Sequence, residues 1–167
     1  YCFVHLSVQE FLAAVYMFHC VTNRNTKVLD DFLGTKWNNT QHDSFLEDIL
    51  GSTMERSFES PNGHLDLFVR FLHGLCLESH QRLFRGLMGQ RENDPKIIQR
   101  VIDNLKEMNS DEISPDRSIN IFHCLMEMND LSVHQEIQEF LKSENRSEKK
   151  LSEIPCSALA YMLQMSE

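Results

Sequence analysis

A succession of short amphipathic segments constrains the fold of this chain more than any other feature of its sequence. From Ser7 onward, runs of about 10–15 residues with apolar side chains at helical spacing follow one another through short polar connections. Such segments must bury their apolar faces against each other. We therefore expect an all-α domain, built as an irregular multi-helix bundle.

Helix start signals recur along the chain. Three serines are followed three residues later by Glu or Gln, as in the capping box that satisfies N–H groups of the first helical turn: Ser7 with Glu10, Ser44 with Glu47, and Ser132 with Gln135. Asp94 and Ser114 each precede a proline, which suits the first helical position because its missing N–H needs no partner there. Gly34 and the turn sequence SPNG, residues 60–63, are predicted to end helices.

The segment HLDLFVRFLHGLCLE, residues 64–78, is predicted to be the central helix because it is apolar on more than one side. Shorter helices are predicted at residues 28–33 and 81–88, and a final helix from residue 157 onward. In the first helix, the side chains expected to form one buried stripe are Val8, Phe11, Leu12, Val15 and Phe18.

The first five residues, YCFVH, are aromatic and β-branched and predict a short β-strand. A single strand is not stable alone. We therefore expect this orphan strand to pair with sequence upstream of Tyr1.

Composition excludes several classes of partner. The net charge of -9 disfavours nucleic acid and anionic membrane surfaces, both of which select basic proteins. No apolar run approaches the roughly 20 residues that a membrane-spanning helix needs. Five cysteines, an odd number without framework spacing, indicate reduced thiols and a cytoplasmic protein.

Motifs for chemistry are weak, so we expect a segment that is not an enzyme. The glycines stand singly, and no phosphate-binding P-loop motif is present in the sequence. Two groups of side chains could be drawn as metal ligands: Cys2, His5, His19 and Cys20, and His73, Cys76 and His80. Neither has the paired spacing of zinc sites, and we predict no metal. His123 and Cys124 are adjacent on a helix and point about 100 degrees apart, which rules out a catalytic pair.

His5 stands out by its position. It lies where the predicted strand meets the first helix, so its ring could reach into a neighbouring cleft and donate a hydrogen bond to an anion. From chemistry alone, an ordinary structural histidine is the commoner explanation. Both explanations stay open at this point.

Four segments together resemble NOD-like receptors that carry a NACHT domain, from the expanded vertebrate branch of that family. They occur in the expected order and cover nearly the whole chain: FVHLSVQEFLAAVYMF, LDLFVRFLHGL, SINIFHCLMEMND and LSEIPCSALAYMLQMSE. The first resembles the end of the winged-helix domain, the next two resemble the second helical domain, and the last resembles the segment that leads into the leucine-rich repeats.

The resemblance implies three parts: residues 1–34 from the winged-helix domain, residues 43–143 as the second helical domain, and residues 144–167 as a linker and the first helix toward the repeats. It also implies that His5 contacts the phosphate of ADP in the full-length receptor. The Walker elements would lie upstream, so we expect this segment alone to bind neither ADP nor ATP.

The implied function is regulatory. The segment would help hold the ADP-bound, autoinhibited state and would couple the repeat sensor to the ATPase module and to self-association. The implied partners are the upstream nucleotide-binding domain and the downstream leucine-rich repeats of the same chain. An alternative from a different class is a stand-alone helical adaptor that binds partner peptides.

Overall fold

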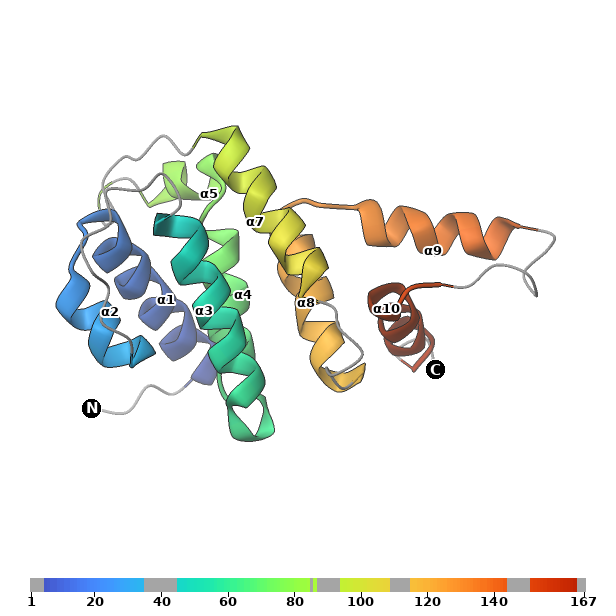
Figure 1. Cartoon of the computed structure of the whole chain (residues 1–167), viewed down its shortest axis with the longest axis horizontal. Coiled ribbons are helices and arrows are strands. Elements are labelled where there is room, and N and C mark those ends of the chain that lie inside the picture. Colours follow the sequence, from blue (N-terminus) through green and yellow to red (C-terminus); the bar gives the residue numbers. More distant parts are fainter. Residues whose placement is uncertain are drawn as a thin grey trace.

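The computed structural model describes residues 5–34, 45–84, 86, 94–108, 115–143 and 151–164, and every element within these ranges is helical (Figure 1). The all-α prediction is confirmed for this part of the chain. The helices are α1 (Leu6–Thr22), α2 (Thr26–Leu33), α3 (Phe45–Glu59), the 3₁₀ turn η1 (Pro61–Gly63), α4 (Asp66–Gly74), α5 (Glu78–Leu83), α7 (Pro95–Glu107), α8 (Pro115–Glu127), α9 (Ser132–Lys142) and α10 (Glu153–Gln164).

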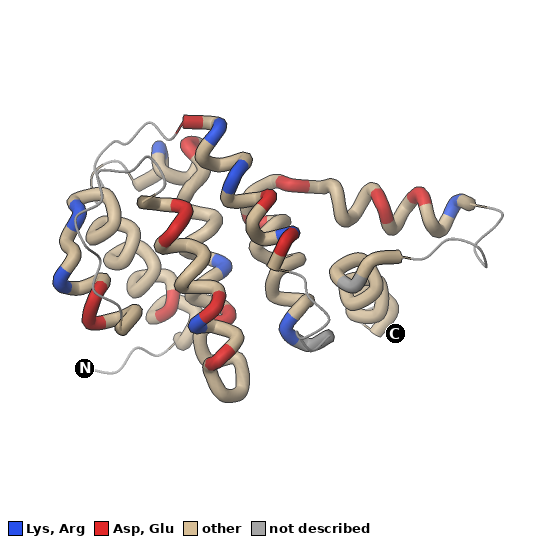
Figure 2. Tube along the Cα trace, in the orientation of Figure 1, with Lys and Arg blue, Asp and Glu red and all other residues tan. Residues whose placement is uncertain are grey.

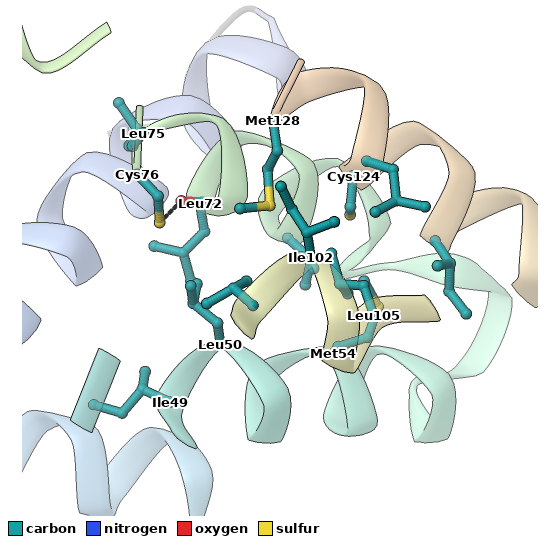
Figure 3. Close-up of a cluster of buried hydrophobic side chains, with 14 of the residues drawn as sticks. Ile49, Leu50, Met54, Leu72, Leu75, Cys76, Ile102, Leu105, Cys124 and Met128 are labelled. Carbon is teal, nitrogen blue, oxygen red and sulfur yellow. Dashed lines mark hydrogen bonds between the residues drawn. The ribbon is translucent and has the colours of Figure 1, made fainter. Parts of the chain in front are cut away.

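Helix α4 lies at the centre of the bundle, as its sequence predicted. It contacts α1 on one side, α8 on another, and α3. Helix α7 packs on α3 and α8, while α10 packs on α8 and α9 (Figure 1). The main core contains Leu50, Met54, Leu72 and Leu105, all almost fully buried where α3, α4 and α7 meet (Figure 3).

The helices with one apolar face follow the sequence closely. In α3, the predicted stripe of Phe45, Leu46, Ile49 and Leu50 is buried. Helix α7 begins as predicted, because the Asp94 side chain accepts a hydrogen bond from the Lys96 backbone N–H at 2.9 Å. Helix α2 ends at Gly34, whose φ of +71° is the left-handed conformation that favours glycine.

Two of the predicted capping boxes are wrong. Helix α1 begins at Leu6, and the backbone carbonyl of His5 accepts from the Val8 and Gln9 N–H groups, so Ser7 already lies inside the helix. Helix α9 begins at Ser132 itself, with Leu131 at the N-cap position, and the Asp130 carboxylate accepts from the backbone N–H of Ser132 at 3.1 Å. In both cases the N-cap residue precedes the serine: it is His5 for α1 and Leu131 for α9.

The third predicted capping box, Ser44 with Glu47, stays a prediction because its serine is not among the described residues. Both carboxylate oxygens of Glu47 accept hydrogen bonds from α7. They accept from Arg100 Nε at 2.9 Å and from Asn104 Nδ2 at 2.8 Å. Glu47 therefore joins α3 to α7.

Two further helices begin at residues other than those predicted, and the predicted strand lies almost entirely outside the described residues. Helix α5 begins at Glu78, before the predicted start at residue 81, and ends at Leu83; of residues 85–88 only Gly86 is described, and it is helical. Helix α10 begins at Glu153, not at residue 157. The predicted strand lies outside the described residues except for His5, whose backbone is extended, with φ -118° and ψ 121°.

Candidate functional site at the start of helix α1

His5 occupies the position from which the sequence predicted it could reach an anion. It is exposed, it is the last residue before α1, and its carbonyl starts the helix. The side chain makes no capping bond to the helix. The first N–H groups of a helix have no intrahelical acceptor and carry the positive end of the helix dipole, so an anion beside His5 would meet both an imidazole and these N–H groups.

The outer face of α1 is apolar from its first turn onward. Leu6 is 67% exposed, and Val8, Leu12 and Tyr16 follow as an exposed row at intervals of four residues. Glu10 is the only charged residue of α1 other than a histidine, so most of the helix is uncharged in Figure 2. The predicted buried stripe is therefore wrong at Val8 and Leu12.

The inner face of α1 is held by aromatic side chains. The ring of Phe11 meets the edge of Phe71 from α4, with ring centroids 5.4 Å apart, and lies 5.3 Å from the ring of Phe84. Further along, Ala14 and Phe18 are buried. These contacts fix α1, and with it His5, against the central helix α4.

Polar bonds then join α4 to α8 and to the end of α3. Arg70 donates to the Asn120 amide oxygen at 2.8 Å, and Arg117 pairs with Asp66 at 3.3 Å. Asp66 also accepts from the Ser57 hydroxyl at 3.0 Å. Because Asn120 and Ser57 are fully buried, these bonds specify one relative position of the three helices.

Helix α8 in turn holds α10. The ring of His123 meets the ring of Tyr161 edge to face at 5.2 Å, and Ile154 and Ala158 of α10 are buried. Burial, together with the nearby Arg70 guanidinium, lowers the pKa of His123 to about 4. The helices α1, α4, α8 and α10 therefore form one continuous series of contacts across the molecule (Figure 1).

The other histidines and cysteines singled out in the sequence are engaged separately. His73 contacts the Val69 carbonyl, Cys76 the Leu72 carbonyl, and His80 the Gly74 carbonyl. Among the described residues, no group of three or more His, Cys, Asp or Glu side chains is placed to hold a metal ion. Cys2 lies outside those residues. Cys124 is fully buried, whereas the neighbouring His123 is only half-buried. Burial raises the pKa of the Cys76 thiol to about 12.

Sequence reasoning missed the polar residues that join the helices. The local sequence around Asp66, Arg70, Arg117 and Asn120 does not show which of them pair with one another. A polar residue inside an otherwise apolar row, such as Asn120 beside Ile119 and Ile121, was the one available signal. In the described ranges, no helix is both long enough and apolar enough to cross a bilayer.

Residues 5–136 match the family model described as the NLRC4 helical domain HD2. The chain belongs to the NLR family, as a segment that contains this helical domain.

Two curated relatives match over the whole chain. "NLR family CARD domain-containing protein 3" from Homo sapiens is 31% identical over 173 residues, and "Protein NLRC3" from Mus musculus is 32% identical over 173 residues. In each case the match covers 100% of this chain and 15% of the relative. The chain thus spans a small part of the relatives' length. No solved structure shows a significant match.

Proposed function

We propose that this segment is the regulatory helical connector of a nucleotide-switched innate immune receptor in the cytoplasm. In the proposal, His5 donates a hydrogen bond to a phosphate of ADP bound by an upstream NACHT-type ATPase domain, and this contact helps hold the receptor in its autoinhibited state. Helix α10 leads toward leucine-rich repeats. A movement of α10 also moves α1, and a movement of α1 also moves α10. When the receptor leaves its autoinhibited state, it can self-associate.

The observation that carries this proposal is the continuous contact between the two ends. His5 begins α1, α1 packs on α4, α4 is bonded to α8, and α8 holds α10. A displacement of α10 cannot leave α1 in place unless one of these contacts breaks. The exposed position of His5 and its place before the free N–H groups of α1 support the phosphate contact.

The segment would contribute one contact to nucleotide binding and no catalytic group. Its part of the phosphate site would be the imidazole and the first turn of α1. ADP and ATP would be held mainly by the upstream domain, and the division into residues 1–34, 43–143 and 144–167 belongs to the same proposal. The direct packing of α1 on α4 means that the first two parts would move together.

The test is a His5→Leu substitution in the full-length receptor that carries this segment. A hydrogen bond to a charged group contributes about 1.5–3 kcal/mol, so we expect ADP retention to fall roughly 10- to 150-fold and basal oligomerisation to rise. His19→Leu is a matched control, because His19 is also exposed and lies near the opposite end of the same helix. Equal ADP retention in the wild type and the His5→Leu receptor would overturn the proposed contact.

A further inference from the structure

A small cavity lies between α3, α4 and α7, away from His5. Its walls include Glu47 and Gly51 of α3, His73 of α4, Asn104 of α7, and Met108, which directly follows α7. The space in which the centre of a water molecule could move is about 10 Å³. That is about the minimum for one water and too little for a larger ligand.

The hydrogen bonding of His73 defines what this cavity can bind. His73 is fully buried, and its Nδ1 lies 2.8 Å from the Val69 carbonyl oxygen. A carbonyl can only accept, so Nδ1 carries the proton. Burial lowers the pKa of His73 to about 4, so the ring is neutral near pH 7 and Nε2 carries a lone pair. Nε2 is buried and has no hydrogen-bond partner among the described residues.

The polar groups that α3 and α7 contribute to the cavity wall can also accept further hydrogen bonds. Glu47 accepts from Asn104 Nδ2 and from Arg100 Nε, and its carboxylate oxygens can each accept more than one bond. The amide oxygen of Asn104 is a further acceptor. A ligand in this cavity must therefore offer at least two hydrogen-bond donors.

We propose that the cavity binds one structural water molecule, which donates to His73 Nε2 and to the Glu47 carboxylate or the Asn104 amide oxygen. Water is the ligand that has two donors and fits the available space. The water would satisfy the buried imidazole and join three helices at one point. Glu47 already joins α3 to α7. The water would connect the central helix α4, through His73, to these two helices.

The test uses nuclear magnetic resonance on the 167-residue chain at pH 7 and needs no variant for its first part. Long-range ¹⁵N–¹H correlation should show His73 with its proton on Nδ1. A rotating-frame cross-relaxation experiment should show a cross-peak between the His73 ring and a water molecule that stays bound longer than bulk hydration water. A His73 ring with its proton on Nε2, or without the water cross-peak, would overturn the proposal.

The second part of the test compares alanine substitutions at two glycines. A methyl group added at Gly51 would contact Met108 Cε at 3.5 Å, an ordinary van der Waals distance, so Gly51→Ala should fit and displace the water. Gly86 has open space around it, so Gly86→Ala is the matched control. We expect the cross-peak to be lost in Gly51→Ala and kept in Gly86→Ala. Its persistence in Gly51→Ala, or a shift of the His73 signals on adding Zn²⁺ to the wild type, would refute the assignment of water to this cavity.

Discussion

Acid should weaken the fold through His73. In the unfolded chain this histidine binds a proton below its ordinary pKa of 6.5, whereas in the folded chain full burial lowers the pKa to about 4. Between these values the unfolded state binds more protons, so the free energy of unfolding falls as the pH falls. The two pKa values differ by about 2.5, and at about 1.4 kcal/mol per unit the loss is about 3 kcal/mol by pH 4.

Urea unfolding followed by circular dichroism from pH 7.5 to pH 4 measures this loss. His73→Phe keeps an aromatic ring at the position but cannot bind a proton, so its stability should depend less on pH than that of the wild type. His123 also has a lowered pKa and titrates in the same direction, so the difference between the wild type and His73→Phe isolates the part due to His73. Parallel curves for the two proteins would refute the reasoning.

Three further results are expected. Leu72 is fully buried, so Leu72→Ala should cost about 2–5 kcal/mol in urea unfolding, and Phe71→Ala, at a half-buried position, should cost less; a Leu72→Ala variant as stable as the wild type would contradict the core assignment. Gly63→Ala should cost more than Gly34→Ala, because both have positive φ but only the methyl at 63 would lie 2.6 Å from Asp66 Oδ2; equal thermal melting temperatures would count against this. Calorimetry on the 167-residue chain should detect no binding of ADP or ATP, and low-micromolar affinity would show that the segment holds a phosphate site of its own.

The parts of the fold that depend on one-sided amphipathic helices could be predicted from the sequence. The buried stripe of α3 and the start of α7 at Asp94 and Pro95 follow from local spacing and local capping. The α1 stripe failed because that helix is apolar around most of its circumference, and periodicity then cannot tell the inner from the outer face. The capping boxes at Ser7 and Ser132 failed because both helices begin earlier than the boxes require: His5 and Leu131 hold the N-cap positions, so both serines lie in the first turn.

The contacts that join the helices could not be predicted from local patterns. Arg70 and Asn120 are 50 residues apart, and Arg117 and Asp66 are 51 residues apart, so their pairing depends on how whole helices cross. The lack of a partner for His73 Nε2 among the described residues likewise depends on how three helices meet. The sequence correctly placed His5 next to the first helix, and its phosphate contact stays a prediction.

Distances between spin labels test the central claim, that α1 and α10 belong to one rigid connection, most directly. Ala13 of α1 and Ala160 of α10 are both exposed and can be replaced by cysteine for labelling, with Cys2 and Cys156 changed to serine. Pulsed electron–electron double resonance is then recorded on the full-length receptor with ADP bound and after activation. The account predicts one narrow distance distribution that is the same in both states. A broad distribution, or a distance that changes on activation, would contradict it.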